Sequence, residues 1–474
     1  MEFYGRKEEL EELERLKGKR TSSLVCLMGR RRIGKSTLIE QFSKKFKKFI
    51  YIQGLGPEAS SNNEKQLDNF SEVLSIQLNS RKEHFTDWTQ AFTYLSKASE
   101  IGETLILLDE ISWMGRHDSL FCSKLKSVWD QSFKKNSKLI LVLCGSVSSW
   151  IEENILNNAS FEGRVSLAIN LEELRIHEIS KFWTSRNFHL SSLEKMLILS
   201  ITGGVPKYLE EVLKSENAER NIVNLCFKPS GMLFNEFENI FSNIFDRKAD
   251  NLEKIIRLCL TTKLSPSELA TKMGKSVDSH LSKSLKILEL SGFLSRDFYF
   301  KPGGVASNQS HLRVKDNYLR FYLKHIEPNK QRILKGGVKI QSLSELSNFE
   351  STMGYQFENL VLRNRESFYH LLDIDNRRIV SASPFTQRSK TKGYCQIDLL
   401  IQSDLDVFYL CELKCKKFIT KSVISEVKRK METISLPRRS ALKPVLIYHG
   451  DVRPDDEEDL RAFFYRMISF EELC

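Results

Sequence analysis

The stretch Gly29-Arg30-Arg31-Arg32-Ile33-Gly34-Lys35-Ser36-Thr37 decides the fold of the N-terminal part of this sequence. It matches the phosphate-binding loop pattern, in which a glycine is followed by four residues of any kind, a second glycine, a lysine, and a serine or threonine. An apolar run, 24–28, precedes the loop, and 38–42 continues as a helix. Backbone N–H groups in such a loop and at the helix start surround phosphate groups, and glycine lets the backbone approach them closely. All nine loop residues are therefore predicted to bind a nucleotide, and the alternative is a basic, solvated turn.

A second motif, Leu105-Ile106-Leu107-Leu108-Asp109-Glu110, supports the first. Its four apolar residues predict a strand buried on both faces of a parallel sheet. Lys35 is expected to reach the outer phosphates, and the Ser36 hydroxyl to bind Mg²⁺. Asp109 would bind the same Mg²⁺ directly or through water, and Glu110 would be the base that orients the attacking water. The alternative is an ordinary strand end followed by a polar turn.

Composition limits the class of protein. The chain has 474 residues, which predicts about three domains, and 41% of them are hydrophobic, enough for real cores. A net charge of +11 suits a polyanionic partner such as nucleic acid, although much of it can be solvated surface. The nine cysteines show no paired framework, and no signal peptide or long apolar run is present. We therefore expect reduced thiols in a soluble cytoplasmic protein without a membrane partner.

The opening Phe3-Tyr4-Gly5-Arg6, taken with the loop and the acidic strand, resembles the AAA+ ATPases, in particular their STAND-like branch in archaea and bacteria. The resemblance implies ATP and ADP as ligands and places the opening near the adenine. The strand 139–146 ends at Ser146, where the family has its first nucleotide sensor. A charged amphipathic helix would resemble the opening equally well.

Two further elements carry the same resemblance. Phe161-Glu162-Gly163-Arg164 implies that Arg164 contacts the γ-phosphate in its own subunit or a neighbour's, where a cation offsets transition-state charge. Contact with a neighbouring subunit's phosphate would require a homo-oligomer, so this assembly is one possible state. The alternative role for Arg164 is a surface ion pair. Gly203-Gly204-Val205-Pro206 resembles the glycine–proline element of the family's lid, so Pro206 is a predicted nucleotide-side residue.

The region from 250 to 325 changes character and resembles a winged helix. Ser265 and Glu268 flank Pro266 as a helix start should. The third helix, 276–290, is predicted to turn Val277, Leu281, Leu285 and Leu288 inward and His280, Lys283 and Lys286 outward. Those polar residues would read DNA in a groove, or the domain would serve as a packing module.

A second chemical constellation lies near the C-terminus. Asp398, followed fourteen positions later by Glu412-Leu413-Lys414, resembles the PD-(D/E)xK nuclease pattern. Residues two apart on a strand point to one face, so Glu412 and Lys414 would lie together and Asp398 would join them from the paired strand. The resemblance implies that Asp398 and Glu412 chelate Mg²⁺ or Mn²⁺, that Lys414 positions or deprotonates water, and that Glu358 on the preceding helix, 349–369, binds the metal through water.

This short pattern has a simpler alternative, since a half-buried strand with charged ends would also produce it. A basic stretch suited to phosphate contacts follows the site, formed by Arg429, Lys430, Arg438 and Arg439. Paired cysteines at zinc-site spacing are absent, so Cys395, Cys411 and Cys415 are predicted to be core thiols.

Together these motifs predict an α/β protein. The expected parts are a P-loop ATPase core with a parallel sheet (1–170), a helical lid (171–249), a winged helix (250–325), a linker (326–348) and a restriction-endonuclease-like α/β domain (349–474). The predicted function is an ATP-hydrolysing switch that controls a metal-dependent nuclease acting on DNA or, alternatively, RNA. A role in defence against foreign nucleic acid fits a gated nuclease, although no residue shows it. The alternative is a nucleotide-gated signalling or scaffolding protein whose last domain only binds nucleic acid.

Overall fold

The computed structural model describes residues 3–56, 62–146, 148–245, 249–301, 305–389 and 391–473. The chain divides into two compact units. The first comprises Met1–Glu173, Ile240–Asp246 and Lys283–Gly292, and the second comprises Leu174–Asn239, Arg247–Ser282 and Phe293–Cys474. Within the described ranges, no helix combines the length and the apolar composition needed to cross a bilayer.

The first unit is built on a parallel sheet of five strands in the order β2-β3-β4-β1-β5. The strands are β1 (Ser23–Met28), β2 (Lys48–Gln53), β3 (Thr104–Asp109), β4 (Leu139–Gly145) and β5 (Val165–Asn170). Every residue of β1, β3 and β4 is buried, as the continuous apolar runs predict for strands covered on both faces. The predicted α/β fold with a parallel sheet is therefore present in this unit.

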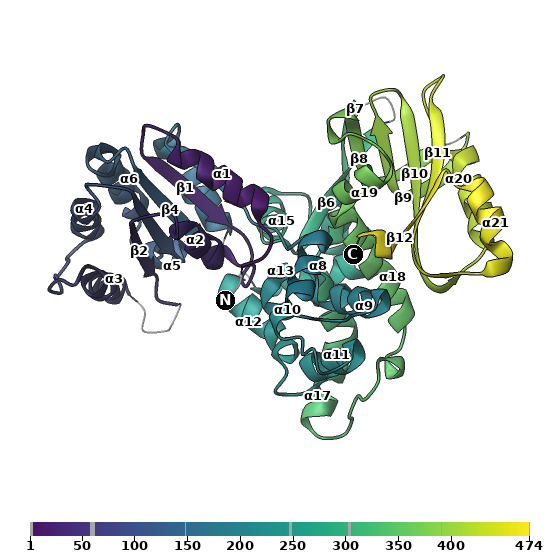
Figure 1. The fold of residues 1–474 in the computed structure, drawn as a ribbon, viewed down its shortest axis with the longest axis horizontal. Coiled ribbons are helices and arrows are strands. Elements are labelled where there is room, and N and C mark those ends of the chain that lie inside the picture. Colours follow the sequence, from purple (N-terminus) through teal and green to yellow (C-terminus); the bar gives the residue numbers. More distant parts are fainter. Residues whose placement is uncertain are drawn as a thin grey trace. The chain divides into compact units, whose positions relative to one another are not determined.

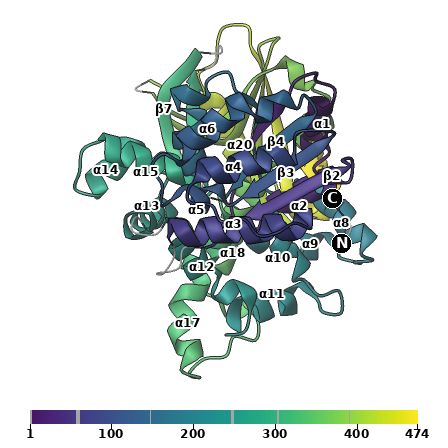
Figure 2. The same ribbon diagram turned by 90° about the vertical axis from the view of Figure 1, so that its left-hand side faces the viewer.

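Helices cover both faces of that sheet (Figure 1). They are α1 (Lys7–Lys17), α2 (Lys35–Ser43), α3 (Asn63–Leu78), α4 (Trp88–Ala98), α5 (Ile111–Gly115), α6 (Phe121–Gln131) and α7 (Ser148–Ile151). Helices α1 and α2 pack on one face, and α3, α4 and α6 pack on the other, the side turned toward the viewer in Figure 2. Trp88, Phe92 and Leu95 of α4 are fully buried there, as expected of a core stripe.

The second unit begins with helices. They are α8 (Ile176–Ser185), α9 (Ser192–Thr202), α10 (Pro206–Glu210) and α11 (Ala218–Phe227), and α12 (Glu236–Phe245) and α15 (Ser279–Leu290) contribute residues to both units. Pro206 is the first residue of α10, as the glycine–proline element predicts. Gly204 could not be another residue without rearrangement, because a Cβ there would lie 2.2 Å from the Leu174 carbonyl oxygen.

The segment from 249 to 314 has the predicted order of three helices followed by an antiparallel strand pair. Its elements are α13 (Ala249–Thr261), α14 (Pro266–Lys272), α15, β6 (Leu294–Lys301) and β7 (Val305–Val314). The Ser265–Glu268 capping box at α14 is present as predicted. On α15, His280, Lys283 and Lys286 are exposed, and Lys286 forms an ion pair with Glu152. The prediction for Val277 is wrong, since it precedes the helix and is 53% exposed.

The segment predicted as a linker, 326–348, contains a helix, and its role as a domain boundary stays a prediction. The helix is α17 (Glu327–Leu334), which follows α16 (Asn317–Phe321), and Pro328 lies in the first turn of α17 where its missing N–H costs nothing. The long helix predicted for 349–369 is divided into α18 (Phe349–Arg363) and α19 (Arg365–Leu371). The side-chain amide of Asn364, at the break, donates to the Leu360 carbonyl at 2.8 Å and so competes with the helical backbone for that acceptor.

The C-terminal part contains a mixed sheet of five strands in the order β12-β11-β10-β9-β8. Its elements are β8 (Ile379–Ser389), β9 (Gly393–Ser403), β10 (Val407–Ile419), α20 (Ser422–Thr433), β11 (Ala441–Val452), α21 (Pro454–Phe463) and β12 (Arg466–Ser469). The predicted hairpin of β9 and β10 is present, whereas β10, β11 and β12 are parallel. Helices α20 and α21 cover one face, to the right in Figure 1, and α18 packs against β10.

Candidate functional site

The phosphate-binding loop connects β1 to α2, as the sequence predicts. Gly29 has φ +142°, and a Cβ there would lie 2.6 Å from the Leu171 carbonyl oxygen. Gly34, which caps α2, has φ +89°. Both glycines are therefore required by the backbone itself. The remaining loop residues divide between core and solvent, because Ile33 is fully buried whereas Thr37 is exposed.

The loop lysine and serine are both held by hydrogen bonds within the protein. Lys35 is buried, and its ammonium donates to the carbonyls of Gly29 and Arg30, both at 3.0 Å. Ser36 Oγ donates to Asp109 Oδ2 at 2.6 Å. A hydroxyl and a carboxylate are the hard oxygen donors that Mg²⁺ prefers, so Ser36 and Asp109 fit this ion. The two motifs, 73 residues apart in sequence, meet at the end of the sheet.

Asp109 is held by neighbours besides Ser36. Its Oδ2 accepts from the Tyr51 hydroxyl at 3.2 Å, and its Oδ1 accepts from the Glu110 N–H at 2.9 Å. Burial, followed by the charge of Asp109, raises the pKa of Tyr51 well above its ordinary value, so this phenol remains a donor. Tyr51 is a site residue that the sequence analysis missed.

Glu110 and Ser146 are brought together. Glu110 has φ +51°, and its Oε2 accepts from Ser146 Oγ at 2.7 Å and from the Ser146 N–H at 3.1 Å. Both residues are buried at the ends of neighbouring strands, β3 and β4. The predicted base and the predicted sensor thus form one hydrogen-bonded pair.

Two arginines connect the phosphate-binding loop to the segment after β5. Neither contact was predicted from the sequence. Arg6 Nη2 donates to the Ile33 carbonyl at 3.2 Å and to the Glu172 carbonyl at 2.6 Å. Arg30 Nη1 lies 3.2 Å from Glu173 Oε1, with side chains only 5% and 2% exposed. Because a buried ion pair is costly to break on one side, this contact fixes Arg30 and the segment beside it.

Arg164 lies in a surface ion-pair network. Its guanidinium donates to Asp130 through Nε at 3.0 Å and through Nη2 at 2.8 Å. Lys126 and Lys134 also contact Asp130, at 3.1 and 2.8 Å. The hydrogen bonds from Arg164, followed by those from the lysines, hold the pKa of Asp130 well below its ordinary value although burial opposes them. The ion-pair alternative therefore describes this arrangement, and the γ-phosphate contact stays a prediction.

The second predicted site is assembled within the second unit. Asp398 on β9 and Glu412 and Lys414 on β10 line one cavity of about 530 Å³, and Glu358 of α18 lines it too. The Leu413 N–H donates to Asp398 Oδ2 at 3.1 Å, and Lys414 Nζ lies 2.7 Å from Glu412 Oε1. All four predicted residues are thus brought together.

Two residues of α20 complete this cluster and were not assigned to it from the sequence. Lys430 Nζ lies 2.6 Å from Glu412 Oε2, and Lys414 Nζ lies 2.9 Å from Glu426 Oε2. Lys430 had been expected only as part of a phosphate-contacting stretch. The signal that could have revealed them is the spacing of Glu426 and Lys430, which places both on one face of a helix.

The pKa values of Asp398 and Lys414 are both raised in this cluster, but for different reasons. Burial, then the charges of Glu412 and Glu358, raises the pKa of Asp398 to about 7. Burial alone would lower the pKa of Lys414, but the carboxylates of Glu412 and Glu426 raise it overall. Lys414 therefore stays protonated, which favours positioning of water over deprotonation of it.

The carboxylates of Asp398 and Glu412 suit a divalent cation, but the described residues do not form a complete set of metal ligands. Asp398 and Glu412 are hard oxygen donors that repel one another, and a dication would relieve that repulsion. In the part of the chain that is described, no group of three His, Cys, Asp or Glu is arranged to hold a metal. Lysines occupy both oxygens of Glu412, and Glu358 lies 2.7 Å from Lys263. Cys395 and Cys411 are buried free thiols, and Cys415 is half-buried.

Comparison with known proteins identifies the first part of the chain. Residues 3–212 match the family described as an ATPase domain predominantly from Archaea. This part of the chain is therefore an ATPase domain of the archaeal type. The uncharacterized protein MJECL04 of Methanocaldococcus jannaschii is 23% identical over 365 residues, which cover 76% of each chain.

Among solved structures, a Walker-type ATPase of Pyrococcus abyssi is 14% identical, with a TM-score of 0.49 over 68% of this chain and 96% of that one. The ORC2 protein of Aeropyrum pernix, in ADPNP and ADP complexes, is 14% identical, with a TM-score of 0.42 over 71% of this chain and 95% of that one.

Proposed function

We propose that this protein binds and hydrolyses ATP in its first unit and that the nucleotide state controls a metal-dependent nuclease in its second unit. The observation that carries the proposal is the pairing of two separate sites, one at Ser36 and Asp109 and one at Asp398 and Glu412. Each site brings together residues that are distant in sequence and that would bind the same divalent cation. Neither arrangement is expected of a protein that only packs or scaffolds.

In the ATP site, the loop N–H groups and Lys35 would hold the phosphates, and Ser36 and Asp109 would hold Mg²⁺. Glu110 would orient the attacking water while Ser146 holds its carboxylate. Pro206 and Arg164 would lie on the nucleotide side of this site.

In the second site, Asp398 and Glu412 would hold Mg²⁺ or Mn²⁺, with Glu358 as a further oxygen donor. A bound dication supplies a Lewis acid and lowers the pKa of water. Lys414, kept protonated by Glu412 and Glu426, would orient that water and offset charge on the phosphate. The net charge of +11 is consistent with a nucleic-acid substrate.

The direct test is cleavage of labelled DNA and RNA by the full chain with Mg²⁺ or Mn²⁺. Asp398→Asn and Glu412→Gln should abolish cleavage, because each removes a carboxylate that holds the cation. Asp375→Asn is the matched control, since that exposed carboxylate pairs only locally with Arg377 at 2.7 Å. Equal cleavage by Asp398→Asn and by the control would refute the proposed site.

A second candidate function is a nucleotide-gated module that binds nucleic acid without cutting it. It is favoured by the two ammonium groups that already neutralise Glu412, at 2.7 and 2.6 Å. If no cleavage occurs in any nucleotide and metal condition while nucleic acid binds, this alternative replaces the nuclease.

A further inference from the structure

A second cavity of about 960 Å³ opens beside the acidic site, also within the second unit. It lies between the strand pair β6–β7 and the strands β8–β9. Tyr394 and Gln396 line both this cavity and the one that contains Asp398 and Glu412. The two hollows therefore adjoin, and together they form a path that ends at the acidic cluster. We call the larger hollow the basic groove and define it by Lys263, Arg296, His311, Arg388 and Tyr394.

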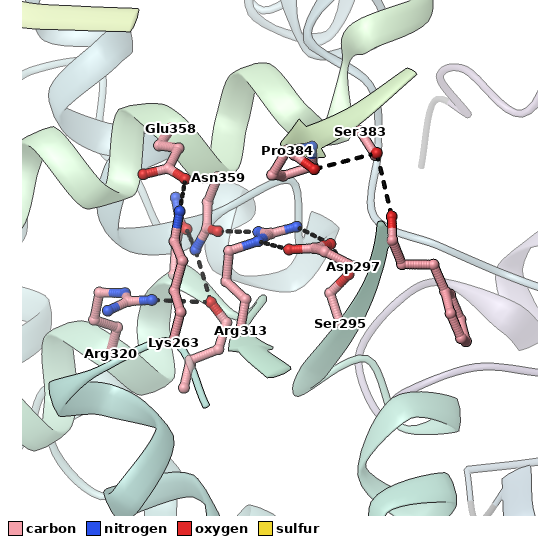
Figure 3. Close-up of polar contacts among 12 residues, drawn as sticks. Lys263, Ser295, Asp297, Arg313, Arg320, Glu358, Asn359, Ser383 and Pro384 are labelled. Carbon is pink, nitrogen blue, oxygen red and sulfur yellow. Dashed lines mark hydrogen bonds and ion pairs between the residues drawn. The ribbon is translucent and has the colours of Figure 1, made fainter. Parts of the chain in front are cut away.

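Polar contacts join the β6–β7 strand pair to α18 and to β8 (Figure 3). Arg313 on β7 contacts Asp297 on β6 at 2.7 Å and also donates to Asn359 on α18. Ser383 Oγ on β8 donates to the Phe298 carbonyl at 3.3 Å, and Lys263 lies 2.7 Å from Glu358. These contacts tie the strand pair to the C-terminal part, so the groove exists before any ligand arrives.

Positive charge converges in the basic groove. Lys263, Arg296 and Arg388 line it, whereas Glu268 is the acid among its described lining residues. Oε2 of Glu268 is engaged in the helix cap, where it accepts from the Ser265 N–H at 2.8 Å. Burial lowers the pKa of His311 below its ordinary value; the charge of Glu268 opposes this shift, and the charges of Lys263 and Arg388 add to it.

The groove also offers an aromatic surface. Tyr394 is 59% exposed, and its hydroxyl donates to Gln396 Oε1 at 2.8 Å, which fixes the ring near the junction of the two hollows. A cationic path with an exposed aromatic ring suits an unpaired strand, because the cations follow phosphates and the ring stacks on a base. A duplex keeps its bases stacked on one another and leaves such a ring without a partner.

We propose that the basic groove binds a single strand of nucleic acid and guides its backbone to the cavity of Asp398 and Glu412. The inference rests on the proposed nuclease function and adds to it the substrate class and the direction of approach. It assigns nucleic-acid contact to the β6–β7 and β8–β9 surfaces and not to the exposed face of α15.

The test measures binding without cleavage. Fluorescence anisotropy of the full chain is recorded in EDTA with a labelled mixed-sequence oligonucleotide, either single-stranded or annealed to its complement. Wild type should prefer the single strand. Arg388→Gln should weaken binding about tenfold and reduce the slope of log affinity against log salt by about 0.7, the value for one contact to a single-strand phosphate. Tyr394→Ala should weaken binding about tenfold, whereas Tyr394→Phe keeps the stacking ring and the affinity.

Arg377→Gln is the matched control for charge, because Arg377 is in the same unit, is 89% exposed and pairs with Asp375 away from the groove. It should bind like wild type. The inference is overturned if Arg388→Gln and Tyr394→Ala bind like Arg377→Gln, or if the duplex binds as tightly as the single strand. Because no metal is present, binding can succeed while cleavage fails, so this result is separable from the nuclease test.

Discussion

The Lys430 ammonium lies 2.6 Å from the Glu412 carboxylate, which is only 1% exposed. Lys414 contacts the other oxygen of the same carboxylate at 2.7 Å. An isolated buried carboxylate would be costly, and these two lysines supply the opposite charge that Glu412 needs in the interior. Asp398 has no such ammonium at hydrogen-bond distance among the described contacts and carries the raised pKa instead. Asp398 is therefore the carboxyl group of this cluster whose pKa is raised toward neutrality.

Asp398 gives the protein a pH-dependent stability. Its pKa of about 7 in the folded protein exceeds the ordinary value of 3.8, so the folded state holds a proton that the unfolded state has released. The contribution is fully present below pH 3.8 and is lost as the pH rises through 7. Urea unfolding in EDTA should show wild type losing on the order of 2–4 kcal/mol relative to Asp398→Asn between acid and mildly alkaline pH.

At alkaline pH, Mg²⁺ should raise the free energy of unfolding of wild type but not that of Asp398→Asn. The reason is that an ion bound only by the folded state stabilises that state. Parallel stability curves for the two proteins across this range would contradict the raised pKa.

Replacing Lys35 by Ala should weaken ATP binding. The loss of a charge-assisted contact costs on the order of 1.5–3 kcal/mol, or about 10- to 100-fold in affinity. Isothermal titration with ATP and Mg²⁺ measures it. Lys44→Ala is the control, because that exposed lysine of the same region bonds only to Gln41. Equal affinity in Lys35→Ala and in the control would remove the loop from the nucleotide site.

Glu110→Gln should retain ATP affinity and lose turnover. Gln keeps the shape of the side chain and a carbonyl oxygen that can accept from Ser146, but it cannot act as a base. Phosphate release at saturating ATP is the measurement, with Glu100→Gln, at an exposed position after α4, as the control. Normal phosphate release by Glu110→Gln would exclude Glu110 as the base.

Arg313→Met should destabilise the second unit by about 3–5 kcal/mol, because it leaves the Asp297 charge half-buried without its cation. Replacing both residues by apolar ones should cost much less than the sum of the single changes, which a double-mutant cycle in urea measures. Additive losses would show that Arg313 and Asp297 do not act as a pair.

The sequence predicts the local motifs well. A loop with fixed glycine spacing needs one backbone conformation, so Gly29, Gly34, Lys35 and Ser36 could be placed from their spacing. The alternation of side chains along a strand likewise placed Glu412 and Lys414 on one face. Both predictions depend on short-range geometry that the residues themselves impose.

Other parts of the sites depend on contacts between distant segments. Arg30 and Glu173 are 143 residues apart, and nothing in their neighbourhoods distinguishes them from solvated charges. The spacing of Glu426 and Lys430 places them on one face of α20, but the packing of α20 on the sheet decides that this face is turned toward Glu412. Val277 fits the apolar periodicity of α15, but the helix begins after it.

The central claim, that the nucleotide controls the nuclease, is tested most directly by one measurement. Cleavage of a labelled single strand is followed with Mn²⁺ in ATP, in ADP and without nucleotide, for wild type, Lys35→Ala and Arg164→Ala. A ligand shifts a conformational equilibrium only by binding one state better, and the γ-phosphate is the group that ADP lacks. The account predicts that wild type cleaves at different rates in ATP and ADP, that Lys35→Ala shows no difference and that Arg164→Ala shows a smaller one. Identical wild-type rates in all three conditions would contradict it and leave two independent activities on one chain.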